Sequence, residues 1–74
     1  MLRIRYERLR RGWSQEQLGR LSHIHQPVIA YIELGRVLPS DDELTSLARA
    51  LGISPPSVLL KPVTVHDPDE AVAS

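Results

Sequence analysis

The sequence contains no cysteine and no phenylalanine, and aromatic residues make up only 4% of its 74 positions. Without cysteine, a disulfide framework and thiolate metal sites are excluded. Small secreted domains usually depend on disulfides, so we expect a cytoplasmic protein. No apolar run approaches the roughly 20 residues of a membrane span, and the N-terminus lacks the apolar stretch of a signal peptide. Aliphatic side chains must therefore form the core of one small domain.

Net charge is also absent, but the charges are unevenly distributed along the chain. Residues 1–36 include seven basic and three acidic residues, a net charge of +4, whereas residues 37–74 include two and six, a net charge of −4. The first half is suited to face a polyanion, with the second half facing away from it. Arginines on solvated helix faces would explain the same pattern equally well.

Residues that typically begin and end helices recur at short intervals along the chain. They predict five helices, over residues 2–11, 15–22, 26–34, 41–51 and 55–60. Capping boxes begin the second helix at Ser14 and the fourth at Ser40, and we expect Ser54 to cap the fifth. The apolar residues at helical spacing in the first helix are Leu2, Tyr6 and Leu9. Prolines and an acidic stretch follow, so residues 61–74 are expected to form a C-terminal tail.

The second and third predicted helices are short and separated by a tight turn, an arrangement typical of helix-turn-helix units. The apolar residues with the spacing that the interior of such a unit needs are Leu18, Ile24, Ile29 and Ile32. The outward positions of the third helix are then Gln26, Pro27, Ala30, Tyr31 and Leu34.

Several ordered segments together resemble a known family. They are residues 9–18 (LRRGWSQEQL), 28–36 (VIAYIELGR), 39–40 (PS) and 47–53 (LARALGI). Over residues 2–60 the chain resembles the Xre-type, phage-repressor-like helix-turn-helix family of transcription regulators. The resemblance implies an all-α, lambda-repressor-like domain of five helices over residues 1–60, followed by a short tail. It also implies binding to double-stranded DNA, with the third helix in the major groove.

The same resemblance implies roles for individual residues. Base contacts are expected from Gln26, Pro27, Ala30 and Tyr31. Gln26 is able to pair with an adenine edge through both amide atoms, and Pro27 and Ala30 offer apolar contact to a thymine methyl group. Two alternatives stay open, with Gln26 as an ordinary surface residue and Tyr31 packed against a neighbouring side chain. Phosphate contacts are expected on this basis from Gln15 and Arg36. We also expect them from His25 and from Arg10, although Arg10 on a solvated helix face is an open alternative. Arg8 and Glu33 are expected to form a buried structural ion pair. His23 stands where the family usually has a glycine with left-handed backbone, and histidine tolerates that conformation better than most residues.

The expected function is a homodimeric repressor or controller on a palindromic operator, because one small unit makes too few contacts for tight specific binding. A restriction-modification controller, a mobile-element repressor and an antitoxin all fit this description. The predicted dimer interface comprises Val58, Leu59, Leu60 and Val63, with a contribution from the tail. His23 and His25 lack a third ligand at suitable spacing, so we expect no metal. No catalytic or cofactor motif is recognised, so we also expect no enzyme activity.

A different class of function stays open. The apolar residues expected on the surface are Val37, Leu38, Val58, Leu59, Leu60, Val63 and Val65. They would also suit a protein-interaction module, such as a toxin-binding antitoxin or an adaptor subunit with little DNA specificity. The zero net charge and the apolar outer face of the third helix favour this alternative modestly. Salt-sensitive binding to DNA distinguishes the two classes.

Overall fold

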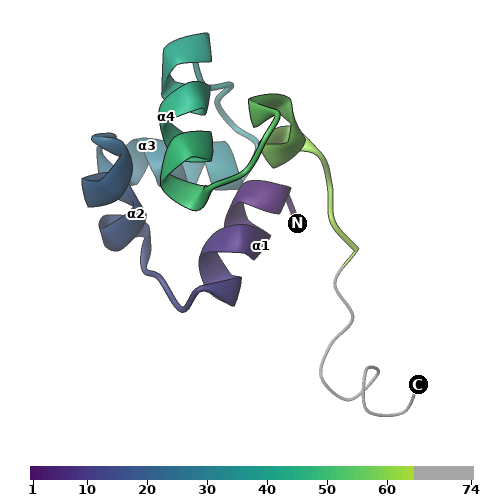
Figure 1. Ribbon diagram of the computed structural model, residues 1–74, viewed down its shortest axis with the longest axis horizontal. Helices are drawn as coiled ribbons and strands as arrows, with labels where there is room; N and C mark the ends of the chain where they lie inside the picture. The colour runs from purple at the N-terminus through teal and green to yellow at the C-terminus, as the bar shows by residue number, and fades with distance from the viewer. Residues whose placement is uncertain (65–74) are drawn as a thin grey trace.

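Five helical segments follow one another along residues 1–64, the part of the chain that this computed structural model describes (Figure 1). They are α1 (Arg3–Arg10), α2 (Gln15–Ser22), α3 (Gln26–Glu33), α4 (Asp41–Leu51) and the 3₁₀ helix η1 (Pro56–Leu60). The prediction of five α-helices is therefore wrong in one respect, because the last segment is a single short 3₁₀ helix. Its N-cap is Pro55 and not Ser54. The ring of Pro56 disfavours helical backbone at the preceding residue, and Pro55 is extended, with φ −73° and ψ 160°.

Reciprocal hydrogen bonds between backbone and side chain begin two of the helices. In α2 the Gln17 backbone N–H donates to Ser14 Oγ at 3.1 Å, and the Ser14 N–H donates to Gln17 Oε1 at 2.7 Å. Ser40 and Glu43 make the same pair of bonds at the start of α4, at 3.1 and 2.9 Å. These capping boxes satisfy backbone donors that the first helical turn leaves free. Both predicted capping boxes are confirmed.

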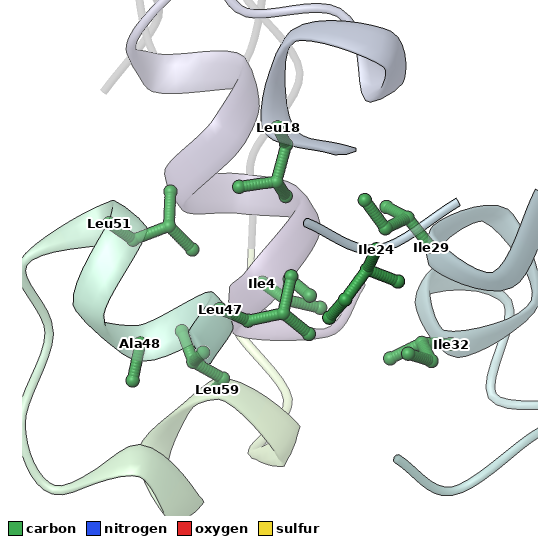
Figure 2. Packing of buried hydrophobic residues seen from close by; sticks show 9 residues of the cluster. All are labelled: Ile4, Leu18, Ile24, Ile29, Ile32, Leu47, Ala48, Leu51 and Leu59. Carbon is green, nitrogen blue, oxygen red and sulfur yellow. The ribbon is translucent and has the colours of Figure 1, made fainter. Parts of the chain in front are cut away.

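Aliphatic side chains from every helical segment converge on one core (Figure 2). Its members are Ile4, Leu18, Ile24, Ile29, Ile32, Leu47, Ala48, Leu51 and Leu59. In α1 the buried apolar residue is Ile4, whereas Leu9 is 47% exposed. The remaining buried positions of α1 are the charged residues Glu7 and Arg8. The inward face of α1 is therefore only partly apolar.

In the view of Figure 1, α3 is drawn behind α4 and beside α2. Helix α2 packs against both α3 and α4, while η1 packs against α4 and α1. The N-terminal residues run antiparallel to the segment after η1, because the Arg3 N–H donates to the Lys61 carbonyl at 2.9 Å and the Val63 N–H to the Met1 carbonyl at 2.7 Å. The first residues after η1 are thus held against the start of α1. The acidic stretch at 67–70 and Val65, both assigned to the tail, lie outside the described residues.

The longest helix of residues 1–64 is α4, with 11 residues. None of the helices in this range combines the length and the apolar character needed to cross a membrane.

Candidate nucleic-acid interface

A three-residue turn joins α2 to α3. His23 ends α2 in the left-handed conformation, with φ 60° and ψ 35°, and its N–H donates to the Gly19 carbonyl. Ile24 is buried in the core, and His25 is the N-cap of α3. Positive φ was expected at His23, and the structure confirms that backbone conformation.

Gly19 allows the turn to approach α2 closely. A Cβ atom built on Gly19 would lie 2.6 Å from the Ile24 carbonyl oxygen, which is a backbone atom with little freedom to move. Ser22, one turn further along α2, is also buried, and its hydroxyl donates to the Leu18 carbonyl at 2.7 Å. The absence of a side chain at Gly19 thus leaves room for the turn that leads into α3.

The inner face of α3 is buried, and its outer face is apolar. Ile29 and Ile32 are fully buried, as the sequence analysis expected. The outward residues after Gln26 are Pro27, Ala30, Tyr31 and Leu34, of which Pro27, Tyr31 and Leu34 are exposed and Ala30 is half-buried. Glu33 is the only charged residue within α3, and it is buried. The outer face of α3 therefore presents no charge of its own.

A buried ion pair joins α1 to the end of α3. Arg8 Nε donates to Glu33 Oε2 at 2.7 Å, and Arg8 Nη2 donates to Glu33 Oε1 at 3.0 Å. The two side chains are only 9% and 2% exposed. Arg8 Nη1 also donates to the Trp13 carbonyl at 2.7 Å, which ties the connection between α1 and α2 to the same guanidinium. The expected pair of Arg8 and Glu33 is therefore present, and its geometry is bidentate.

Two glutamines extend this ion pair to the surface. Gln15 Nε2 donates to Glu33 Oε1 at 3.1 Å, and Gln26 Nε2 donates to Gln15 Oε1 at 2.7 Å. Gln15 thereby orients the Gln26 amide, and Glu33 orients the Gln15 amide. Glu33 is itself held by the Arg8 guanidinium. Gln15 and Gln26 are both half-buried and stand at the N-termini of α2 and α3. The start of α3 is thus coupled to the core through polar contacts.

Basic and acidic side chains both lie on the exposed side of this unit. His25 and Arg36 are exposed, and Arg20, His23 and His25 line a hollow in the surface over the turn together with the acidic Glu16. Of the three acidic residues in the first half of the chain, Glu7 and Glu33 are buried and paired with arginines, and Glu16 is exposed. The exposed surface of the first half therefore stays net positive, with Glu16 as its one exposed acidic residue.

An arginine cluster around Glu7 is the feature that the sequence analysis missed. Glu7 is 1% exposed and is contacted by Arg3 at 2.9 Å, Arg10 at 3.1 Å and Arg11 at 2.7 Å. Burial alone would raise the pKa of Glu7, but hydrogen bonds from Arg11 and Arg3 and the charge of Arg10 outweigh it, so the pKa lies below its ordinary value. The spacing of three and four residues on one helix was the available signal.

Arg11 also links α1 to the rest of the fold. Its Nη2 donates to the carbonyl of Leu51, the last residue of α4, at 2.6 Å. Its guanidinium lies 5.7 Å from the centre of the Trp13 ring, within range of a cation–π contact. Arg10, for which phosphate contact was expected, is 57% exposed despite its contact with Glu7. Arg11 is therefore a structural residue, whereas Arg10 is accessible.

The residues expected at a dimer interface are not equally accessible. Leu59 is fully buried in the core of the single chain, so its assignment to the interface is wrong. It is buried because η1 packs its inward residue against α4 and α1. Val58, Leu60 and Val63 are half-buried, and Leu60 packs against the core. Among the residues of the alternative docking surface, Val37 is 44% and Leu38 83% exposed.

The comparison with known proteins identifies the class to which this arrangement belongs. Residues 4–58, more than half of the chain, match the family described as helix-turn-helix. The chain therefore belongs to this family, the Xre-type, phage-repressor-like group of DNA-binding transcription regulators. No significant match was found among curated proteins or among solved structures.

Proposed function

We propose that this protein is a sequence-specific transcription regulator, a repressor or controller that binds a palindromic operator as a homodimer. The observation that supports it best is the position of Gln26 at the start of α3, with its amide oriented by Gln15. In this proposal α3 enters the major groove and α2 crosses the DNA backbone, as in other helix-turn-helix proteins. A regulator of this kind acts where the genome lies, which is the cytoplasm in a cell without a nucleus.

Gln26 is proposed to read an adenine. A bidentate contact to adenine requires an acceptor for N6–H and a donor for N7. One hydrogen of Gln26 Nε2 is used by Gln15 Oε1, which leaves Oε1 and the second Nε2 hydrogen for the base. The bond to Gln15 fixes the orientation of the Gln26 amide. Its Oε1 acceptor and its second Nε2 hydrogen are therefore already placed to pair with adenine. Pro27, Ala30 and Tyr31 are proposed to lie against neighbouring bases.

Gln15 is proposed to hold a phosphate. It is the first residue of α2, where free backbone N–H groups and the helix dipole favour an anion. Glu33 accepts one hydrogen of Gln15 Nε2 and leaves the other available. His25, Arg36 and Arg10 are the further phosphate contacts that we propose, and all three side chains are accessible. These contacts would position α3 without reading sequence.

The homodimer is proposed because two copies on two half-sites supply the contacts that one small unit lacks. With Leu59 in the core, the proposed interface consists of Val58, Leu60 and Val63 with residues that follow them. A mobile-element repressor, a restriction-modification controller and an antitoxin remain equally suitable contexts. Sedimentation at high micromolar concentration tests the dimer, and a monomer under those conditions would contradict it.

The test of DNA reading is a selection of preferred sites from random duplexes, followed by gel shifts at several salt concentrations. Gln26→Ala should cost about 1–3 kcal/mol on the preferred site and abolish discrimination at one base pair. Arg36→Ala should weaken binding to all sequences about equally and lower the salt slope by about one. Gln15→Ala should weaken binding to all sequences and should also reduce discrimination at the base pair that Gln26 reads, because it removes the acceptor that orients the Gln26 amide. Arg49→Ala, which removes an exposed arginine of α4, is the matched control and should change neither property.

Two outcomes would contradict the proposal at different levels. An unchanged selected sequence for Gln26→Ala would refute the assignment of base reading to this residue. No salt-sensitive binding to any duplex would refute DNA regulation altogether and would favour the protein-interaction module instead.

A further inference from the structure

We propose that the outer face of α3 reads the C5 methyl group of pyrimidines in the major groove, so that 5-methylcytosine is accepted in place of thymine at the contacted positions. The inference rests on the proposed function and specifies its ligand. It concerns the apolar stripe of α3, which consists of Pro27, Ala30, Tyr31 and Leu34.

The stripe is continuous along the helix. Its members are spaced three and four residues apart, so they lie on one face. Tyr31 is 49% and Leu34 61% exposed, and both belong to the most exposed large apolar residues of the described chain. Exposed apolar side chains in a contiguous group indicate a contact surface.

Hydrogen-bonding capacity on this face is small. Within α3 the one charged side chain, Glu33, is bound to Arg8 and Gln15 and faces inward. The remaining polar groups on the outer face are the Gln26 amide and the Tyr31 hydroxyl. Most of the stripe therefore cannot distinguish base edges by their hydrogen-bond donors and acceptors. Its contact with DNA is stabilised mainly where it meets an apolar group.

The surroundings of the stripe favour DNA as its occupant. Arg20 precedes the stripe and Arg36 follows it, and both side chains are exposed. An apolar stripe flanked by cations is complementary to a ligand that has phosphates at its rims and apolar groups between them. The major groove meets this description, and its apolar group among the four standard bases is the thymine methyl.

The chemistry of this contact leads to a specific consequence. Thymine and 5-methylcytosine place the same methyl group in the groove, whereas they differ in the group at position 4, an oxygen acceptor in one and an amino donor in the other. Pro27, Ala30 and Leu34 have no side-chain group that senses this difference. Contact with the stripe should therefore give thymine and 5-methylcytosine a higher affinity than cytosine, and the stripe should bind thymine and 5-methylcytosine about equally.

The experiment uses the full chain and the preferred duplex obtained by site selection. At each thymine of a half-site, the base is replaced in turn by deoxyuridine, by cytosine and by 5-methylcytosine, with guanine opposite the last two. At one position or more, deoxyuridine should weaken binding about fourfold, the effect of losing one buried apolar carbon. At the same position, 5-methylcytosine should bind about fourfold more tightly than cytosine.

A pair of protein variants assigns the contact to α3. The double variant Tyr31→Ala, Leu34→Ala should bring the ratio between thymine and deoxyuridine affinities toward one at a position where the unaltered protein discriminates. The control is Leu9→Ala, Leu21→Ala, which removes side chains of 47% and 53% exposure from α1 and α2. The control should leave every ratio unchanged.

The results that would overturn the proposal are separable from failure of the proposed function. Salt-sensitive, sequence-specific binding with equal affinity for thymine and deoxyuridine at every position would refute methyl reading while leaving DNA regulation intact. A selected site without thymine, or ratios that the Tyr31→Ala, Leu34→Ala variant does not alter, would refute it as well. Absence of salt-sensitive binding to any duplex would overturn both, and the stripe would then be a protein-binding surface.

Discussion

The buried ion pair between Arg8 and Glu33 is expected to be a major determinant of stability. Arg8→Met would leave the Glu33 carboxylate, 2% exposed, with Gln15 as its remaining side-chain donor. The Trp13 carbonyl would lose its contact with the guanidinium as well. Removing one partner of a buried pair typically costs about 3–5 kcal/mol, because the other charge stays buried. A domain of this length is stabilised by only about 4–11 kcal/mol, so this single substitution should remove much of the total.

Urea denaturation, followed by far-ultraviolet circular dichroism, measures this loss. Arg5→Met is the control, because Arg5 is an exposed residue of the same helix and its replacement should change the free energy of unfolding by less than about 0.5 kcal/mol. If Arg8→Met does not fold, Glu33→Gln provides a milder variant. It keeps the shape of the side chain and should cost about 1.5–3 kcal/mol, the range for a hydrogen bond to a charged group.

A double variant separates the charge effect from the loss of packing. Arg8→Met combined with Glu33→Leu removes both charges and should be more stable than Arg8→Met alone, because no unpaired ion is left in the interior. The single variant Glu33→Leu completes the comparison. A loss in the double variant equal to the sum of the losses in Arg8→Met and Glu33→Leu would refute this reasoning, and so would a cost below about 1 kcal/mol for Arg8→Met.

Three further perturbations follow from the described contacts. Gly19→Ala should cost about 1–3 kcal/mol in denaturation experiments, because the added Cβ meets the Ile24 carbonyl at 2.6 Å; an unchanged midpoint would contradict it. Ser40→Ala should cost about 1 kcal/mol, because the Glu43 N–H loses its acceptor, and Ser57→Ala, an exposed serine of η1, should cost less. The lowered pKa of Glu7 contributes stability above its ordinary pKa of 4.5, and this contribution is lost as the pH falls below that value through the folded-state pKa. Glu7→Gln should therefore show a flatter decline of stability below pH 4.5 in thermal melts, and parallel curves for the two proteins would exclude this role.

The starts of helices were predicted best where the signal is a hydrogen bond between a side chain and a backbone group a few residues away. The capping boxes at Ser14 and Ser40 close hydrogen bonds over three residues, so their presence in the sequence nearly determines where α2 and α4 begin. The start of η1 was misjudged although its signal is also local. Ser54 resembles a cap, but Pro56 imposes extended backbone on Pro55, and this constraint outweighs the cap.

The buried face of α1 was harder to predict, because its burial does not follow hydrophobicity. A pattern of apolar residues selected Leu2, Tyr6 and Leu9. Leu2 does pack against the core, but Leu9 is exposed, and the buried side chains of α1 are Ile4, Glu7 and Arg8. A charged residue is buried only when a partner satisfies it. The partner of Arg8 lies 25 positions away in sequence, and only the family resemblance pointed to it.

The order of residues alone determined the helix-turn-helix unit, its caps and the outward positions of α3, because each depends on helical periodicity or on groups a few residues apart. The tertiary structure decided three other features: Leu59 is inside, Glu7 is buried among arginines, and Gln26 is joined through Gln15 to the pair of Arg8 and Glu33. These features depend on which groups lose contact with water when the helices pack. That loss is set by contacts between segments distant in sequence, and the free energy of a buried charge or amide depends on the partner that packing brings to it.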